Sequence, residues 1–198
     1  MLRFPGGFED MEMAAIAKRH KMDQMVAFAQ DAFVEAEFEK PWVVLDQLAK
    51  LVSRSSMVSM FEKPKFKGFI AALSDDEKVR FADALHNRLY EDEEQGFNDM
   101  LEMLSVAKLA KWSLISICPV YFSPFKEVYV KPTTTKGIIA TLELKDLAYK
   151  PRPSWGFYKR YRDTIEEMKA HVCSSLSPNN AAFTGFLMMS LPSSSNIV

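Results

Sequence analysis

The sequence predicts a mainly α fold, with one domain built as a bundle of several helices around a buried central helix. Glycine is scarce, at seven of 198 residues, whereas the residues that favour helix are abundant. Apolar residues recur at three- and four-residue steps along most of the chain. The most apolar stretch, residues 111–136, has such patterns on both sides and contains three prolines. We therefore expect the other helices to pack around it.

The N-terminal part of the chain is expected to form a leader followed by a helical sub-layer. A Pro-Gly-Gly sequence prevents regular structure, so residues 1–7 are interpreted as a flexible leader. Helical periodicity predicts one long helix or two consecutive helices over residues 8–38. Pro41 suits the first position of the next helix, and residues 8–57 together are assigned to the sub-layer. The buried stripe predicted for that next helix is Trp42, Leu45, Leu48, Ala49 and Val52.

Two helices are predicted next, over residues 61–73 and 75–90. Ser74 and Glu77 have the spacing of a capping box, in which the serine accepts an amide hydrogen bond and the glutamate reaches back to the cap amide. This signal places the start of the second helix at residue 75. The buried face predicted for it consists of Val79, Ala82, Leu85 and Leu89.

An acidic run at residues 91–94 precedes an apolar helical pattern over residues 97–107. Acidic residues at the entrance of a helix stabilise its dipole, and no octahedral ligand spacing accompanies these, so no metal site is predicted. With Asp99 and Glu102, the segment carries six negative charges and no lysine or arginine. Such a segment could promote self-association, bind a basic partner or balance positive charge within the molecule.

The central stretch is predicted to contain a helix and then a short extended segment. Residues 112–122 are apolar on nearly every side and predict the buried central helix, which Pro119 bends or ends. Val128-Tyr129-Val130 is β-like and bounded by prolines. Because so short a segment cannot build a sheet, at most one short β-hairpin or extended segment is expected near residues 127–131.

Three helices are predicted in the last third of the chain. The first runs from the threonines after Pro132 to about residue 142, the second covers residues 155–173, and the third covers residues 177–191. Residues 192–198 are expected to be a frayed tail.

Composition excludes several classes of protein. The formal net charge of −1 gives no global field that would recruit nucleic acid or an anionic membrane. No signal-peptide pattern is present, and no apolar run approaches the roughly 20 residues that span a bilayer. The two cysteines, Cys118 and Cys173, have no CxxC or Cys/His partner spacing and are expected to be reduced and buried. These observations favour a cytoplasmic, bacterial-type protein without membrane contact.

No motif predicts a catalytic residue, a metal or a cofactor, so whether the chain is an enzyme stays open. Asp83 and His86 share one helical face, but the pair lacks the third ligand that zinc or di-iron sites need. A structural or surface role for His86 is therefore favoured. The chain contains no GxSxG nucleophile elbow, no Walker sequence and no GxGxxG sequence.

A basic stretch with interleaved aromatic residues covers residues 145–162. It carries six positive charges against one negative charge, a local charge of +5. Lysine and arginine beside tyrosine and tryptophan suit phosphate contact with base stacking. The alternative is a buried aromatic stripe with an ordinary charged exterior. The candidate nucleic-acid-binding residues are Lys150, Arg152, Lys159, Arg160 and Arg162.

A second candidate site lies where the proline-bounded segment meets a helix N-terminus, a place suited to anion binding. The candidate ligand- or anion-binding residues are Lys131, Thr133, Thr134 and Trp155. A pocket there could also receive His86. The alternative interpretation of the sequence from Lys131 to Thr133 is a turn and a helix cap.

Several phrases occur in a fixed order: KWSLISICPVYF, EVYVKPTTTK and YKPRPSWGFYKRY. Together they resemble a family of uncharacterised bacterial helical proteins that has a tryptophan-led apolar helix followed by V-K-P-T and P-x-W-x-x-Y motifs. The resemblance covers about residues 58–191 and implies a fold and an order of elements more than an activity. The family has an acidic residue near the start of its last helix, where this chain has Ser177-Pro178-Asn179-Asn180.

The sequence therefore favours a non-enzymatic helical module that binds a macromolecular partner, either protein or nucleic acid. The alternative is a small-ligand or anion-binding protein, or an enzyme, with a pocket near Lys131, Thr133 and Trp155. Self-association as a homo-oligomer through exposed methionine and phenylalanine side chains is a third hypothesis.

Overall fold

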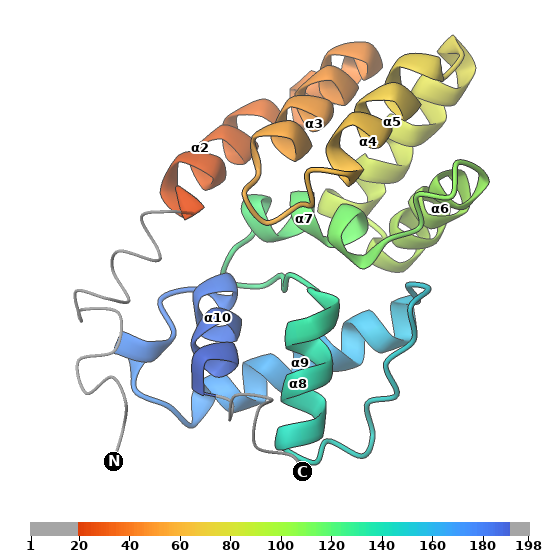
Figure 1. The fold of residues 1–198 in the computed structure, drawn as a ribbon. Coiled ribbons are helices and arrows are strands. Elements are labelled where there is room, and N and C mark those ends of the chain that lie inside the picture. The colour runs from red at the N-terminus through yellow and green to blue at the C-terminus, as the bar shows by residue number, and fades with distance from the viewer. Residues whose placement is uncertain (1–19, 191–198) are drawn as a thin grey trace.

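The structure is a computed structural model that describes residues 20–190 (Figure 1). The predicted leader (1–7) and tail (192–198) lie outside these residues. The helices are α2 (Met22–Ala32), η2 (Glu35–Glu39), α3 (Pro41–Arg54), α4 (Glu62–Ala72), α5 (Asp75–Tyr90), α6 (Glu93–Val106), α7 (Trp112–Phe122), α8 (Pro132–Thr141), α9 (Trp155–Ala170), η3 (Ser174–Leu176) and α10 (Asn180–Ser190). The prediction of a mainly α, multi-helix fold is confirmed.

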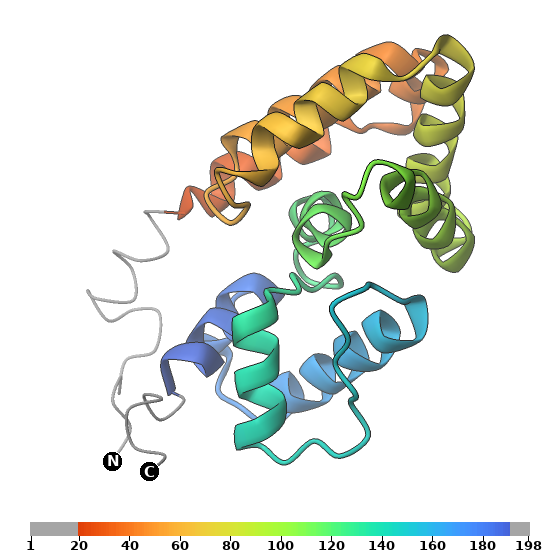
Figure 2. The same ribbon diagram turned by 45° about the vertical axis from the view of Figure 1, so that its right-hand side comes forward.

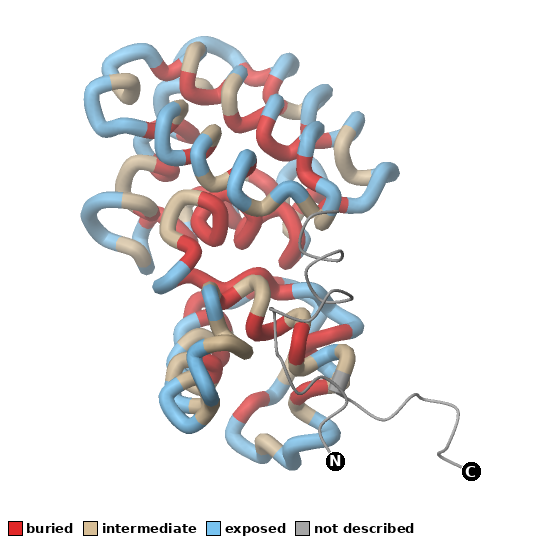
Figure 3. Tube along the Cα trace, turned by 90° about the vertical axis from the view of Figure 1, so that its left-hand side faces the viewer, coloured by how far each residue is buried: buried red, intermediate tan, exposed pale blue. Residues whose placement is uncertain are grey.

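The helices form two groups with α7 between them. Helices α2 to α6 make up one group and α8 to α10 the other, as two views of the ribbon show (Figure 1, Figure 2). Apart from Phe122, every residue of α7 is buried, so this helix has no solvent-facing stripe (Figure 3). The sequence predicted its role as the central helix correctly. Pro119 lies inside α7 and does not end it.

The segment after α7 is extended, and side chains rather than a strand satisfy its backbone. Between residues 20 and 190 the chain contains no β-strand. The amide of Val128 donates to the Tyr158 hydroxyl (3.3 Å), and the amide of Val130 donates to Ser116 Oγ (3.2 Å). Both valines are fully buried, and an unpaired amide there would cost free energy. The segment is thus fixed between the two helical groups.

Helix α5 begins as the capping box predicts. Ser74 Oγ accepts a hydrogen bond from the Glu77 amide, and the Glu77 carboxylate accepts one from the Ser74 amide (2.8 Å). Its buried face differs from the prediction, because Val79 is 42% exposed whereas Arg88 is buried. Helix α5 packs against both α3 and α6, so its buried surface is wider than one stripe and displaced from Val79.

Gly96 lets α6 approach α5 closely. A Cβ atom at this position would lie 2.2 Å from the amide nitrogen of Arg88 and 2.5 Å from the carbonyl oxygen of Ala84. Both are backbone atoms, which cannot rotate away as a side chain can. The absence of a side chain at Gly96 therefore determines how close the two helices lie, and with that distance the position of Arg88.

Two further burial predictions from the sequence are wrong. Trp42, assigned to the buried stripe of α3, is 63% exposed. It lies in the first turn, where α3 contacts the short helix η2, and Val44 and Leu45 supply the buried side chains of that turn instead. Cys118 is buried as expected, but Cys173 is exposed because it follows the end of α9.

Candidate functional site

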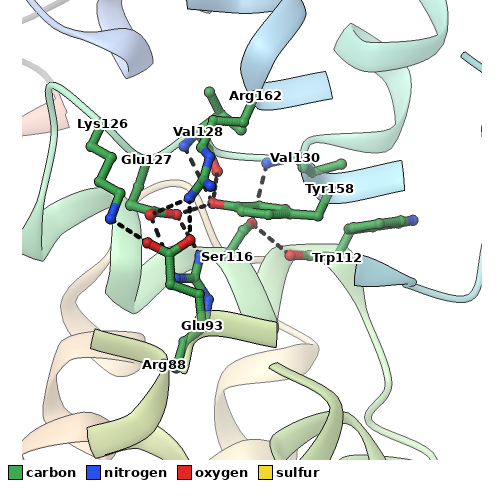
Figure 4. A network of polar contacts seen from close by, with 10 residues as sticks. All are labelled: Arg88, Glu93, Trp112, Ser116, Lys126, Glu127, Val128, Val130, Tyr158 and Arg162. Atoms are coloured by element: carbon green, nitrogen blue, oxygen red, sulfur yellow. Dashed lines mark hydrogen bonds and ion pairs between the residues drawn. The ribbon is translucent and has the colours of Figure 1, made fainter. Parts of the chain in front are cut away.

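A network of charged side chains joins the two helical groups (Figure 4). Helix α5 contributes Arg88 and α6 contributes Glu93, while α9 contributes Arg162. Lys126 and Glu127 come from the segment that follows α7. The side chains of Arg88 and Glu127 are 1% and 4% exposed. We call these five residues the junction network.

Glu127 is the centre of the junction network. Arg88 donates to its carboxylate through both terminal nitrogens, and Arg162 Nη1 donates to Oε1 (2.7 Å). The Tyr158 hydroxyl donates to Oε2 (2.6 Å). A carboxylate buried without such partners would carry a large desolvation penalty. Four hydrogen bonds from three side chains compensate that penalty here.

Glu93 links the junction network to the surface. Its carboxylate accepts a hydrogen bond from Arg162 Nη1 (2.8 Å) and another from the Lys126 ammonium group. Burial alone would raise the pKa of Glu93, but the hydrogen bonds from Lys126 and Arg162 outweigh it, so this pKa lies below the ordinary value of 4.5. Glu93 is therefore a carboxylate at neutral pH.

Aromatic rings cover the two arginines. The guanidinium of Arg88 lies 5.4 Å from the centre of the Trp155 ring and 5.2 Å from that of Tyr158. Arg162 lies 5.6 Å from the Trp155 ring and 6.0 Å from the Tyr158 ring. These distances are within the range of cation–π attraction. The two rings, themselves stacked 5.8 Å apart, therefore help to hold both cations at the junction.

The Tyr158 hydroxyl stays protonated at neutral pH. Burial raises its pKa well above 10, and the negative charge of Glu127 raises it further. Burial would lower the pKa of Arg88, but the charges of its partners outweigh that effect and leave this pKa above its ordinary value. Neither group can exchange a proton near pH 7, so the pair is suited to holding Glu127 in place rather than to acid–base chemistry.

An open cleft of about 500 Å³ lies beside the junction network. One wall is the turn from α5 into α6, where Asp92 caps α6 by accepting a hydrogen bond from the Gln95 amide (2.9 Å). The other wall is the start of α9. The lining residues are Glu91, Asp92, Glu93, Glu94, Trp155, Lys159 and Arg162. We call it the junction cleft.

The junction cleft is unlike a typical small-molecule pocket. Small-molecule pockets are lined mostly by apolar and aromatic side chains, whereas Trp155 is the one uncharged lining residue here. Arg162 and Glu93 neutralise each other within the junction network. In the described part of the chain no ion pair includes Glu91, Asp92, Glu94 or Lys159. Three carboxylates and one ammonium group remain, so the cleft has an excess of two negative charges.

The five predicted nucleic-acid-binding residues are used in different ways. Arg162 is bound to Glu93 and Glu127, and its side chain is 12% exposed. Arg160 pairs with Asp146 (3.1 Å) at the surface. Lys159 lies in the junction cleft among carboxylates. Lys150 and Arg152 are exposed in the segment before α9. Nucleic-acid binding through these residues stays a prediction.

The predicted ligand-binding residues do not meet at the junction cleft. Trp155 lines it, but Lys131, Thr133 and Thr134 do not. Lys131 is the exposed N-cap residue of α8, and the Thr134 hydroxyl donates to the Met188 sulfur in α10 (3.1 Å). The turn-and-cap interpretation describes where Lys131 lies, and anion binding by these residues remains a prediction.

His86 belongs to an aromatic cluster in the first helical group. Its ring stacks on Tyr90 (5.3 Å) and meets Phe38 edge-on (5.0 Å). Its Nε2 atom lies 3.7 Å from Glu35 Oε1. Within residues 20–190, no three histidine, cysteine, aspartate or glutamate side chains are grouped so that they could hold a metal ion. This position agrees with the structural role favoured for His86.

Sequence reasoning missed the two most deeply buried members of the junction network. Arg88 follows Phe81 by seven residues and Ala84 by four, the spacing of one helical face, so an arginine on an apolar face was the available signal. Glu127 had no comparable signal, because it lies in an irregular segment without periodicity. Its partners are 31 to 39 residues away in the sequence.

Comparison of the chain with family models, with curated proteins and with solved structures finds no match. In the described part of the chain, no helix has both the length and the apolar character that crossing a membrane requires.

Proposed function

We propose that this chain is a non-enzymatic helical module that binds a protein partner, and that basic side chains of the partner enter the junction cleft. The observation that carries the proposal is the unbalanced charge of the cleft. Glu91, Asp92 and Glu94 are exposed and take part in no ion pair of the described residues, and Lys159 is the one cation free to oppose them. A cationic partner would relieve this imbalance.

A protein partner is favoured over nucleic acid because two of the three candidate arginines, Arg160 and Arg162, are held in ion pairs. Phosphate recognition needs lysine and arginine groups that are free to replace counterions. Arg162 is held by Glu93 and Glu127, and Arg160 by Asp146. The carboxylates at the rim of the cleft would repel a phosphate backbone.

Binding is favoured over catalysis because the buried charges compensate one another. Glu127 accepts hydrogen bonds from Arg88, Arg162 and Tyr158. Its carboxylate is thus committed to internal partners. A general base has to reach a substrate proton and have a pKa near the working pH, and neither Arg88 nor Tyr158 meets the second condition.

Fluorescence anisotropy tests the proposal with three labelled probes of equal length: a lysine–serine peptide, a glutamate–serine peptide and oligothymidine DNA. We expect the lysine–serine peptide to bind, and its affinity to fall with added salt. The triple variant Glu91→Gln, Asp92→Asn, Glu94→Gln should bind about tenfold more weakly, since three exposed charge pairs of about 0.5 kcal/mol each total about 1.5 kcal/mol, and about 1.4 kcal/mol corresponds to a tenfold change in affinity. Asparagine at position 92 keeps the oxygen that caps α6.

The matched control is Asp83→Asn, Glu143→Gln, Glu167→Gln, which removes the same charge from exposed residues outside the junction cleft. Its affinity for the lysine–serine peptide should stay within about twofold of the unaltered protein, because distant surface charges are screened. Equal weakening in both triple variants would refute a specific cleft. Tighter binding of the DNA than of the peptide would replace this proposal with the nucleic-acid alternative, and no binding of the peptide would remove it.

A further inference from the structure

A second, smaller groove lies between α2, η2 and α3, away from the junction cleft. Its volume is about 220 Å³, below the roughly 300 Å³ at which small-molecule pockets begin. The volume suits one or two inserted side chains better than a small ligand. The lining residues are Phe28, Asp31, Ala32, Glu37, Val43 and Gln47. We call it the α2–α3 groove.

The α2–α3 groove combines apolar walls with an acidic rim. Phe28, Ala32 and Val43 are partly buried side chains of the walls, and the guanidinium of Arg54 lies 5.1 Å from the centre of the Phe28 ring. Asp31 is exposed and forms no ion pair within the described residues, whereas Glu37 forms a long ion pair with Lys40 (4.0 Å). Such a surface fits a partner that presents an apolar side chain next to a cation.

Exposed apolar side chains extend this surface. Trp42, 63% exposed, directly precedes Val43 in the first turn of α3, and Val34, 42% exposed, directly precedes η2. Exposed tryptophan is among the residues most enriched at the energetic centres of protein interfaces. Trp42 and Val34 are thus exposed apolar residues adjacent in sequence to the elements that form the groove.

The chain itself carries a complementary surface at the start of α4. Met60 and Phe61 are each 76% exposed. Lys65 and Lys67 are exposed and belong to no ion pair of the described residues. Phe61 and Lys65 are four residues apart, so their side chains lie on one face of the helix. We call residues 60–67 the basic segment.

The two surfaces cannot meet within one molecule. The groove residues Val43 and Gln47 belong to the first half of α3 and Trp42 to its first turn, whereas the basic segment follows the loop after α3 ends. Helix α3 has 14 residues, which corresponds to a length of about 21 Å. A second copy of the chain can supply the missing partner to each surface.

We infer that the protein self-associates head to tail, with the basic segment of one copy in the α2–α3 groove of the next. Phe61 fills the apolar part of the groove, while Lys65 reaches the carboxylates of Asp31 and Glu37. The contact joins two different surfaces and leaves one of each free at the ends. Contacts of this kind give rings or open chains rather than a closed two-fold dimer.

Light scattering during size-exclusion chromatography, over a range of loading concentrations, tests the inference. The mass of the unaltered protein should rise with concentration beyond that of two chains. A groove variant, Asp31→Asn, Glu37→Gln, Trp42→Ser, and a segment variant, Phe61→Ser, Lys65→Ser, should each remain at the mass of one chain. Serine suits the N-cap position that Phe61 occupies in α4.

Mixing the two variants in equal amounts gives the decisive result. The groove variant keeps an intact basic segment and the segment variant keeps an intact groove, so one contact can form and none can propagate. The mixture should stop at the mass of two chains, which a misfolded variant could not produce. The cleft variant Glu91→Gln, Asp92→Asn, Glu94→Gln should associate like the unaltered protein.

Three results would overturn the inference. One is an unaltered protein that stays at the mass of one chain at every concentration. Another is a groove or segment variant that still associates by itself. The third is a mixture that stays at the mass of one chain although the unaltered protein associates, which would assign the contact to other surfaces. None of these results bears on peptide binding in the junction cleft, because the two sites share no residue.

Discussion

Carboxylates lie in two contrasting environments around the junction of α5, α6 and α9. Glu127 has a side chain that is 4% exposed and accepts hydrogen bonds from two arginines and a tyrosine. Glu91 and Glu94, on either side of Glu93 in the sequence, are exposed and belong to no ion pair of the described residues. The buried carboxylate is committed to the fold, whereas the exposed ones are available to a partner. Within the acidic run itself, Glu93 pairs with Lys126 and Arg162, so neighbouring acidic residues also differ in role.

The energies of the two environments differ as well. Removing one member of a buried ion pair leaves a charge without compensation in a medium of low polarity. An exposed carboxylate is solvated by water whether or not it has a partner. Substitutions in the junction network should therefore change stability, and substitutions at the rim should change binding. The following variants, ordered by expected effect, test this distinction.

Arg88→Met should have the largest effect, a loss of about 3–5 kcal/mol in the free energy of unfolding, because it leaves the buried Glu127 carboxyl group with fewer partners. Urea denaturation followed by circular dichroism measures it. Arg160→Met is the matched control, since Arg160 is 58% exposed and pairs with Asp146 at the surface; it should cost no more than about 1 kcal/mol. Equal losses in the two variants would contradict a stabilising role for the junction network.

Gly96→Ala should lower the free energy of unfolding by about 3 kcal/mol, because the new Cβ would lie 2.2 Å from a backbone atom of Arg88 and would push α5 and α6 apart. The same measurement applies. At Gly156, in the first turn of α9, a Cβ atom would meet nothing within 4 Å. Gly156→Ala should therefore be neutral, or stabilising by up to about 1 kcal/mol. A harmless Gly96→Ala would show that this close approach is not required.

Tyr158→Phe should cost about 2 kcal/mol at pH 7, because the substitution leaves the Val128 amide and one Glu127 oxygen without their hydroxyl partner. Tyr161→Phe is the control: the buried Tyr161 hydroxyl interacts with Thr135 but makes no hydrogen bond of ordinary geometry to any described residue, so its removal should cost less. A larger loss for Tyr161→Phe would contradict the assigned hydrogen bonds.

The raised pKa of Tyr158 also predicts that the free energy of unfolding depends on pH in the alkaline range. Its pKa is higher in the folded state than the ordinary value of 10, so its contribution to stability is complete below pH 10 and is lost as the pH rises further. Tyr158→Phe removes this contribution. The stability of the variant should therefore fall less steeply above pH 10 than that of the unaltered protein, as denaturation at a series of pH values would show.

Glu93→Gln should have the smallest effect, and one that depends on pH. The pKa of Glu93 is lowered from 4.5, so its carboxylate contributes stability above about pH 4.5, and this contribution disappears as the pH falls through the lowered pKa. The variant should lose stability at pH 7 and approach the unaltered protein at low pH. Glu94→Gln, the neighbouring rim substitution, should change stability by no more than about 0.5 kcal/mol at either pH.

Much of the fold followed from local signals in the sequence. The capping box of Ser74 and Glu77 placed the start of α5 correctly, and the continuous apolar pattern identified α7 as the central helix. The sequence predicts that the short β-like segment near residues 127–131 forms no sheet. The described residues contain no strand, in agreement with this prediction. Caps and periodicity act between residues three or four apart, so a single sequence contains the information they need.

The candidate site depended on tertiary structure. Trp155 and Lys159 came from two separate sequence predictions, and the acidic run came from a third observation, yet all of them line one cleft. No local pattern could place them together, because the turn after α5 and the start of α9 are about sixty residues apart in the sequence.

The burial of charged side chains is the property that the sequence predicted least well. The sequence by itself determined where α3, α5, α7 and α9 begin and which helix is central, because those properties depend on neighbouring residues. Only the packing of the helices determines which charged side chains are buried. It buries Arg88, Glu127 and most of Arg162 and leaves Glu91 and Glu94 exposed. A charge can be buried where folding brings its partners from other elements, and Arg88 and Glu127 are 39 residues apart.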